Sequence, residues 1–331
     1  MAINAESGFS NKEFHFSSDE LIFHPEVVVS KGVTELEICD EKILSDKNLL
    51  EKLLKNFSQK APDIFLTFSL DISIIDKKLV DLFAGVSCCL LFDFLPSFLD
   101  ENKKMLKHKI NLLNDAGLIF GFCVETKKFG TMKKFKLCID EIVAYYPNHI
   151  YIQNDELKPT DKLSTQDIKT IKRISFALET FYTYGRAVPW FLTVVQSLHL
   201  KPNNLIWDFS EWQICNNCGL SESLEKNSFS PDSAPYTEIL KMQLSFLQIK
   251  YEEKHLNHIF IAASDLIKLH AAFSMCYFDG TETELELSYN PEDLFSPYAM
   301  NLASFAEEVC MEMCKIKIYS TENGAEFRIE Q

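Results

Sequence analysis

Polar side chains follow five apolar runs of the chain, at the point where each run ends. Carboxylates and amides that converge in this way can hold a cation, a metal ion or an amine-bearing ligand. Convergence requires that the runs be parallel strands, because parallel sheets and barrels bind ligands at the carboxyl ends of their strands. Loops after strands are polar in any case, so simple solvation is the alternative interpretation. The candidate ligand-binding residues are Asp40, Glu41, Ser69, Asp71, Asp93, Glu125, Thr126, Gln153 and Asn154.

Two cysteines form a C-x2-C pair, Cys215 and Cys218, which Gly219 follows. The pair supplies half of a structural zinc site, which needs four ligands. We therefore expect no metal ion, and this pair is the candidate if one binds. Reduced, buried thiols are the alternative, and no thioredoxin-like context favours a redox role. Further ligands would come from Cys310, Cys314, His199, His255 or His258.

Other groups of residues have a structural interpretation. His255 and His258 are three residues apart and are expected to share a half-exposed helix face. No Walker loop, G-x-S-x-G or H-E-x-x-H motif occurs, and only 10 glycines argue against a glycine-rich phosphate site. An aromatic cluster is expected in the core, with a partner surface as the alternative. Its members are Phe181, Tyr182, Tyr184, Trp190 and Phe191.

The net charge of the chain argues against two classes of partner. The chain has 33 basic and 48 acidic residues, a formal charge of −15. This field repels polyanions, so we expect neither nucleic acid nor an anionic membrane surface as a partner. The first residues lack the basic and apolar regions of a signal peptide, and no run of about 18 apolar residues occurs. These features predict a cytoplasmic protein with reduced cysteines.

The five apolar runs alternate with helical patterns, and this rhythm predicts parallel strands joined by right-handed crossover helices. Nearly continuous apolar runs are typical of strands with both faces covered. A closed barrel of eight such units takes about 250 residues, and about 120 residues here follow the pattern. The predicted fold class is therefore α/β, with a partial (β/α) barrel of parallel strands. The runs are 34–39, 64–68, 88–92, 118–124 and 149–152.

A different organisation follows residue 155. Ser164 and Asp167 fit a capping box that begins a helix, and Gly185 is expected to end it. A second helix is predicted at 190–198, a connector at 203–212, and a β-hairpin around Asn323-Gly324. The expected parts are an irregular amino-terminal segment (1–32), the partial barrel (33–155), a helical extension (156–218), a loop (219–235) and a small α+β carboxyl-terminal region (236–331).

About half of the chain resembles a known family. ELEICDE at 35–41 is similar to the second barrel strand of the cobalamin-binding-domain radical S-adenosylmethionine proteins, and LFDFL at 91–95 to the fourth. The stretch 111–126 resembles their fourth helix and fifth strand, and YPNHIYI at 146–152 the start of the sixth strand. Residues 163–185 resemble the helical extension of one subgroup. The resemblance implies a barrel ancestry and makes S-adenosylmethionine a ligand to consider.

The chain departs from this family in the features that carry its chemistry. The family holds a 4Fe–4S cluster with a C-x3-C-x2-C motif after the first strand, and no such triplet occurs here. Nothing before residue 33 corresponds to the first strand or to the cobalamin domain. The Gly-Leu-Pro stretch expected after strand five is replaced at 127–131, and the Gln-Ser pair after strand four reads Leu95-Pro96. We therefore expect no 4Fe–4S cluster and no cofactor in this chain.

Three functions remain open. The one we favour is a radical-SAM-like pseudoenzyme without its own cluster, acting as a small-molecule-binding or accessory subunit beside a complete radical SAM enzyme. The second is an enzyme that uses the acidic strand ends for non-radical or metal-assisted chemistry. The third is a structural or interaction protein built around the helical extension. Fold analogy alone does not decide among them, because one fold hosts many functions.

Overall fold

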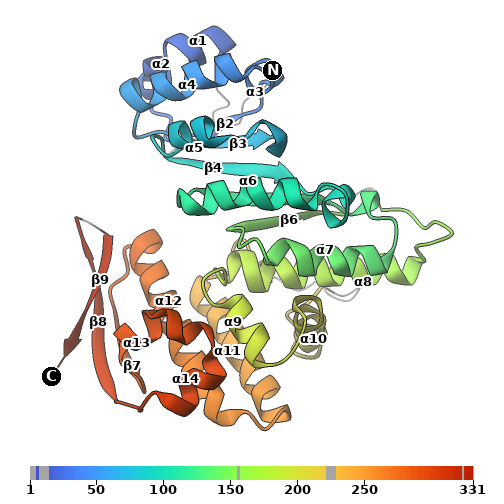
Figure 1. Cartoon of the computed structure of the whole chain (residues 1–331), viewed down its shortest axis with the longest axis vertical. Helices are drawn as coiled ribbons and strands as arrows, with labels where there is room; N and C mark the ends of the chain where they lie inside the picture. Colours follow the sequence, from blue (N-terminus) through green and yellow to red (C-terminus); the bar gives the residue numbers. More distant parts are fainter. Residues whose placement is uncertain (1–4, 7–14, 155–156, 221–228, 323, 331) are drawn as a thin grey trace. The chain divides into compact units, whose positions relative to one another are not determined.

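The computed structural model describes residues 5–6, 15–154, 157–220, 229–322 and 324–330. The chain divides into two compact units (Figure 1). The first unit comprises Met1–Gly130 and Pro147–Leu157, and the second comprises Thr131–Tyr146 and Lys158–Gln331. The chain thus enters the second unit for one helix, returns to the first for one strand, and then completes the second.

A six-stranded sheet with the order β1-β2-β3-β4-β5-β6 forms the centre of the first unit. β2 to β6 run parallel, each beside its predecessor in the sequence, and β1 pairs antiparallel with β2 at the edge. The predicted α/β class and the five parallel strands are confirmed. The strands are β1 (Ala5–Glu6), β2 (Glu35–Ile38), β3 (Phe65–Leu70), β4 (Cys88–Asp93), β5 (Ile119–Glu125) and β6 (His149–Gln153).

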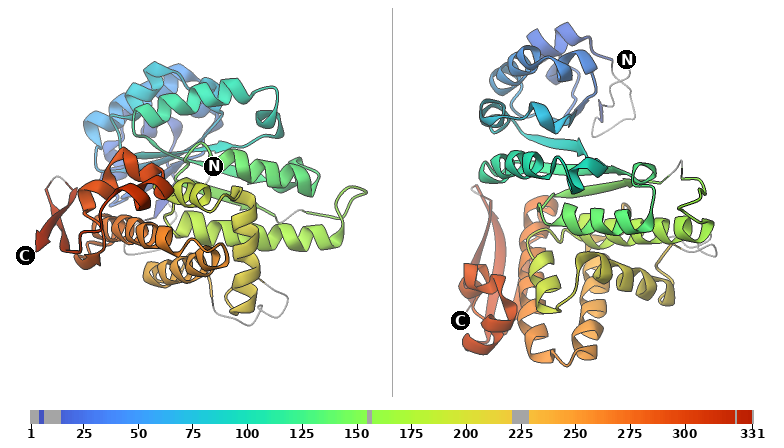
Figure 2. Two further views of the ribbon diagram at one scale, coloured as in Figure 1. Left: turned by 60° about the horizontal axis from the view of Figure 1, so that its bottom comes forward. Right: turned by 45° about the vertical axis from the view of Figure 1, so that its right-hand side comes forward.

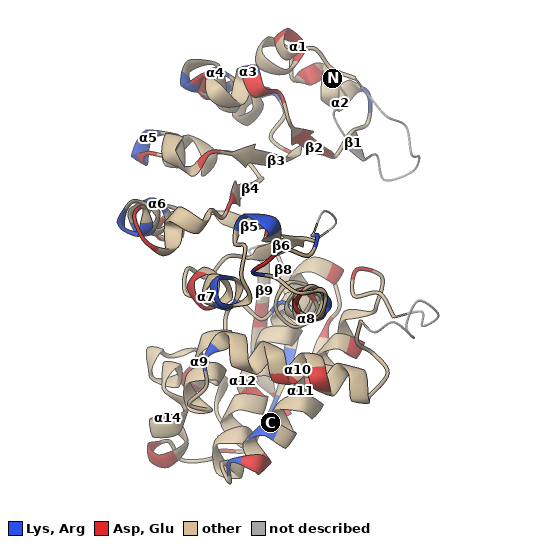
Figure 3. Cartoon of the chain, turned by 90° about the vertical axis from the view of Figure 1, so that its right-hand side faces the viewer, with Lys and Arg blue, Asp and Glu red and all other residues tan. Residues whose placement is uncertain are grey.

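Helices α4, α5 and α6 lie in a row along one side of this sheet (Figure 3). Asp76 caps α5, with its carboxylate accepting from the Leu79 N–H at 3.0 Å. The residues at the N-cap positions of α4 and α6 are Asp46 and Asn102. The helices of the unit are α1 (Ser18–Phe23), α2 (Glu26–Ser30), α3 (Glu41–Ser45), α4 (Lys47–Lys60), α5 (Lys77–Phe83) and α6 (Lys103–Asp115), with 3₁₀ turns η1 (Ile72–Ile74), η2 (Pro96–Leu99) and η3 (Thr126–Lys128).

The two faces of the sheet differ in burial. Leu66, Phe68 and Leu70 of β3 are buried, whereas the alternate residues are half-buried or, at Ser69, exposed. Because side chains alternate along a strand, the register sets out rows on this second face. One row runs Ser69, Leu91, Gly121 and His149, and the next runs Asp93, Cys123 and Tyr151. The second face therefore carries polar groups, and it leads to the carboxyl ends of the strands.

Residues 18–30 were expected to be irregular, and this expectation is wrong. They form α1 and α2, and Ser17 and Glu20 make a capping box at the start of α1. Leu21 and Ile22 are buried, so packing stabilises a helix too short to stand alone. Residues 1–4 and 7–14 of the same segment lie outside the described residues.

The second unit is mainly helical. The predicted capping box is confirmed, since Ser164 Oγ accepts from the Asp167 N–H at 3.1 Å and Asp167 accepts from the Ser164 N–H at 2.9 Å. The connector predicted at 203–212 is wrong, because these residues form most of α10. The helices of the second unit are α7 (Met132–Val143), α8 (Thr165–Leu178), α9 (Phe191–Ser197), α10 (Pro202–Cys215), α11 (Tyr236–Glu253), α12 (Asn257–Asp279), α13 (Pro291–Phe295) and α14 (Leu302–Glu308). The unit also has a π-helix at Glu179–Tyr184 (η4) and a 3₁₀ turn at Pro297–Met300 (η6).

A three-stranded antiparallel sheet completes the second unit beside α12 (Figures 1 and 2). It consists of β7 (Thr283–Leu287), β8 (Cys314–Thr321) and β9 (Gly324–Glu330). β8 and β9 form the predicted hairpin, of which Asn323 lies outside the described residues. Ile316 and Ile318 are buried on one face, and the other face carries ion pairs such as Glu284–Lys315 at 2.8 Å.

Several helices end on a residue other than glycine whose backbone has the left-handed conformation. Arg186, His199, Asn217 and His255 have φ between 48° and 58°. In each case the next residue donates to the carbonyl five residues before it, and the left-handed residue donates to the carbonyl three before it, as in a Schellman motif. Glycine usually occupies this position, and its scarcity in this chain leaves the position to other residues.

Helix α12 is long and apolar enough to cross a membrane by length and composition. The share of its most apolar window buried inside the protein is 56%. It packs against α11, α13, α14 and all three strands of the small sheet. Helix α12 therefore packs as a core helix of the second unit.

Candidate functional site

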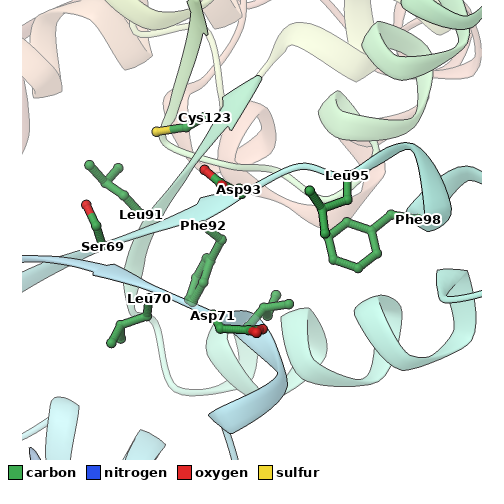
Figure 4. A pocket seen from close by; sticks show the side chains of 10 residues that line it. Ser69, Leu70, Asp71, Leu91, Phe92, Asp93, Leu95, Phe98 and Cys123 are labelled. Atoms are coloured by element: carbon green, nitrogen blue, oxygen red, sulfur yellow. The ribbon is translucent and has the colours of Figure 1, made fainter. Parts of the chain in front are cut away.

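A cavity of about 320 Å³ opens at the carboxyl ends of β3, β4 and β5 (Figure 4). Its polar lining residues are Ser69, Asp71, Asp93 and Cys123. Its apolar lining residues are Leu70, Ile72, Leu91, Phe92, Leu95 and Phe98. The volume lies at the lower end of the range for small-molecule pockets, which runs from about 300 to 1,000 Å³.

The sheet places these side chains by its register. Ser69 lies opposite Leu91, and Asp93 lies opposite Cys123, all on the second face of the sheet. β3 ends at Leu70, so Asp71 begins the turn beyond the strand. After β4, the turn η2 brings Leu95 and Phe98 to the cavity, and Phe98 packs edge-on against Phe94 at 5.6 Å. Rigid strands and a packed turn thus hold the lining.

Asp71 has one structural hydrogen bond and remaining acceptor capacity. Its Oδ1 accepts from the Ser73 N–H at 2.8 Å, which caps the turn η1. Among the described residues, no ion pair involves Asp71. A carboxylate offers about four acceptor positions, so Asp71 can accept further hydrogen bonds from a ligand.

Two lysines reduce the negative charge around the strand-end carboxylates Glu125 and Asp93. Lys127 and Lys128 each lie 2.6 Å from Glu125, and Lys128 Nζ lies 3.7 Å from Asp93 Oδ2. These hydrogen bonds, that of Lys127 first, hold the pKa of Glu125 below its ordinary value. The hydrogen bond to Glu125 raises the pKa of Lys128. The negative charge of Glu125 is therefore balanced by two lysines of the protein itself. Asp93, whose side chain is 68% exposed, has the longer contact with Lys128.

The thiol of Cys123 is held in its neutral form. Burial raises its pKa to about 11, and the carboxylates of Asp93 and Glu37 add to the effect. Nucleophilic chemistry requires the thiolate, which is scarce at neutral pH when the pKa is this high. Cys123 therefore contributes a polarisable wall and a weak donor to the cavity.

Asp40 and Glu41 do not reach the cavity. Asp40 caps α3, with its carboxylate accepting from the Lys42 N–H at 2.9 Å and from the Ser18 hydroxyl. Glu41 is an exposed residue in the first turn of α3. The expected convergence of these two residues with Asp71 and Asp93 in one cavity is therefore wrong, because neither β2 nor the residues after it contribute to the lining.

Thr126 follows β5, Gln153 is the last residue of β6 and Asn154 follows it, and none of the three lines the cavity. The buried Thr126 hydroxyl donates to the Gln153 carbonyl at 2.9 Å and ties the two strand ends together. Gln153 is exposed. The Oδ1 atom of Asn154 is buried and has no hydrogen-bond partner among the described residues. Of the nine strand-end residues expected to bind a ligand, the cavity brings together Ser69, Asp71 and Asp93.

The candidate metal ligands are dispersed. The Cys215 to Cys218 segment is the Schellman ending of α10, in which the Cys218 N–H donates to the Gln213 carbonyl at 2.9 Å. His199 and His255 are the left-handed residues that end α9 and α11, so His255 and His258 do not share the helix face we expected. Within the described residues, no group of three or more histidine, cysteine or carboxylate side chains could hold a metal ion. No candidate metal centre emerges from these residues.

The aromatic cluster between 181 and 191 belongs to the core, as expected. Phe181, Tyr182, Trp190 and Phe191 are buried, and Phe181 contacts Phe209 at a centroid distance of 4.8 Å. Tyr184 is half-buried. Gly185 is required here, since a Cβ would lie 2.2 Å from the Gln243 amide nitrogen that donates to the Gly185 carbonyl. The alternative of a partner surface does not apply to the four buried members.

Seven lining residues escaped the sequence analysis: Leu70, Ile72, Leu91, Phe92, Leu95, Phe98 and Cys123. The alternation along β4 and β5 could have placed Leu91 and Cys123 on the polar face, given the register. Lys128 at the rim was also missed, although it follows Glu125 by three residues.

The fold and the cavity define an α/β protein with a small-molecule-sized site at the ends of parallel strands. Comparisons of the chain with family models, curated proteins and solved structures found no match.

Proposed function

We propose that this protein binds a small amine in the cavity at the ends of β3 to β5. The observation that carries the proposal is a cavity of about 320 Å³ with two carboxylates, Asp71 and Asp93, against an apolar wall. A carboxylate binds an ammonium group by charge-assisted hydrogen bonds, which are roughly twice as strong as neutral ones. The net charge of −15 favours the approach of a cation over that of an anion.

The ligand is a primary or secondary amine with a short apolar body. The ammonium group lies at Asp71 or Asp93, where the acceptor capacity is incompletely used. The apolar body lies against Leu91, Leu95 and Phe98. The neutral thiol of Cys123 supports binding without covalent chemistry.

In this proposal the first unit derives from the radical S-adenosylmethionine barrel. Five parallel strands in sequential order support a partial (β/α) barrel. Without the cluster motif, the chain acts as a cytoplasmic pseudoenzyme that presents a ligand to a complete radical enzyme. Anaerobic purification followed by iron and sulfide analysis tests this part. We expect neither element, and about four of each per chain would overturn it.

Ligand-observed NMR with matched compounds tests amine binding. We expect a short alkylamine to bind, while the alcohol and the carboxylic acid of the same length do not. S-adenosylmethionine belongs in the same panel because of the sequence resemblance. Failure of every amine to bind would overturn the proposal.

Substitutions that remove charge without changing shape locate the site. Asp93→Asn should raise the Kd of the amine about tenfold, since it removes a charged acceptor. Asp71→Asn should do the same, because an amide oxygen can still cap the Ser73 N–H. Asp40→Asn is the matched control, a capping aspartate outside the cavity, and should leave the Kd unchanged. Equal affinity in all four proteins would refute this location.

A further inference from the structure

We propose that β9 pairs with β9 of a second copy of the chain, so that two small sheets join into one six-stranded antiparallel sheet. In the described part of the chain, β9 pairs with β8 on one side and with no strand on the other. An edge strand of this kind offers unpaired backbone N–H and C=O groups to another strand. This inference is independent of the cavity and its ligand.

The free edge of β9 lacks the usual protection against pairing. Its residues, Gly324–Glu330, contain no proline, and its register with β8 is continuous over seven pairs without a bulge. Lysine often protects edge strands, but the lysines of this sheet, Lys315 and Lys317, lie on the central strand β8. A second β9 therefore meets no local obstacle.

The charges on the outer face of β9 are complementary to themselves. When two β9 strands pair antiparallel about Phe327, Glu326 of each copy lies opposite Arg328 of the other, and Ala325 lies opposite Ile329. Opposite charges that face one another across strands stabilise the pair. Arg328 is available for this contact, since its side chain is 63% exposed and lies 3.7 Å from Glu330.

The apolar side of the same edge supports the pairing. Ile329 is 47% exposed, and Phe295, which contacts Phe327 at 6.4 Å, is 41% exposed. A paired β9 would cover the Ile329 side chain and extend the apolar face that Ile316 and Ile318 begin. Burial of this surface is favourable in water.

The other edge of the sheet gives an internal comparison. β7 carries Glu284 and Glu286 on its outer face, and self-pairing about Leu285 would place these two carboxylates opposite one another. Like charges directly opposite are destabilising. The cross-strand charge interactions therefore favour self-pairing at the β9 edge and oppose it at the β7 edge. A two-fold β9 pair uses both β9 edges, so the assembly closes at a dimer and does not continue as an open chain of copies.

Sedimentation velocity over a concentration series tests the dimer. We expect the full chain to be a concentration-dependent dimer, and Arg328→Glu to raise its Kd about tenfold or more by placing two like-charged pairs at the interface. The double variant E326R/R328E reverses both charges, so it should restore the affinity to within about threefold. Circular dichroism and thermal unfolding of each variant should match those of the natural chain, which checks that the variants fold.

Lys317→Glu is the matched control, because it makes the same change of charge on the same face of the central strand. It should leave the dimer Kd unchanged. A chain that is monomeric at all concentrations would overturn the proposal. A dimer insensitive to Arg328→Glu, or one that the double variant does not restore, would also overturn it, since the contact would then lie elsewhere or in another register.

Discussion

His199 and His255 have a backbone conformation that is unfavourable for any residue with a Cβ. Their φ values of 52° and 58° lie in the left-handed region, where the Cβ approaches the following carbonyl. Each nevertheless ends a helix with the two hydrogen bonds of a Schellman motif. The two histidines therefore share a backbone role, the ending of a helix.

His255→Gly should stabilise the protein by about 1 kcal/mol, because glycine removes the left-handed penalty. Urea unfolding at neutral pH measures the change. His258→Gly is the matched control three residues along the chain, an exposed position in the first turn of α12. There glycine should destabilise by up to about 1 kcal/mol. The same sign for both variants would contradict this account of His255.

At the scale of elements, α12 combines a long apolar surface with buried ionisable groups. Asp265 is buried in its middle and accepts from the Ser288 N–H at 2.5 Å, which ties the end of β7 to the helix. Burial raises the pKa of Asp265. One turn later, burial lowers the pKa of His270 to about 4, where its ring packs edge-on against Phe295 at 5.4 Å.

The folded state therefore disfavours protonation of His270. An unfolded histidine titrates near pH 6.5, so the unfolded chain binds this proton first as the pH falls. The stability that neutral His270 contributes is fully present above about pH 6.5 and is lost progressively as the pH falls toward 4. The lost free energy is about 3 kcal/mol at the low end.

His270→Leu removes this titration. The difference in unfolding free energy between the variant and the natural chain should shift in favour of the variant as the pH falls from about 6.5 to 4. Urea unfolding at a series of pH values measures this difference. A difference that stays constant across the series would contradict the lowered pKa of the half-buried His270.

Elements are predictable where local signals and packing agree. The five parallel strands follow from apolar runs, and the capping box of Ser164 and Asp167 begins α8 as expected. Helix α10 escaped prediction because part of its start is fixed from outside, where Asp140 of α7 accepts from the Asn203 N–H at 2.9 Å. Short helices such as α1 are likewise stabilised by packing, which a sequence pattern does not contain.

The site is less predictable than the fold. Asp71 and Asp93 were identified because residues at strand ends are polar and converge. Asp40 and Thr126 satisfy the same rule but do not line the cavity: Asp40 caps α3 beyond β2, and the Thr126 hydroxyl donates to the Gln153 carbonyl. Cys123 was missed because its place in the cavity depends on the register of β4 against β5.

For the whole molecule, the two units carry different roles. The first unit positions the cavity on the strands of its parallel sheet, and the second unit supplies a helical body with a sheet whose edge is open. The sequence places the strand-end site but does not identify the ligand, because Leu95 and Phe98 of the apolar wall and the lysine Lys128 come from turns outside the strands. The amine-binding cavity is therefore the central claim.

A crystal structure of the protein with the tightest-binding short amine tests that claim most directly. The account predicts density for the amine in the cavity, with its nitrogen within hydrogen-bond distance of the Asp93 or Asp71 carboxylate and its apolar end against Leu91, Leu95 and Phe98. An amine bound elsewhere while this cavity stays empty would contradict it.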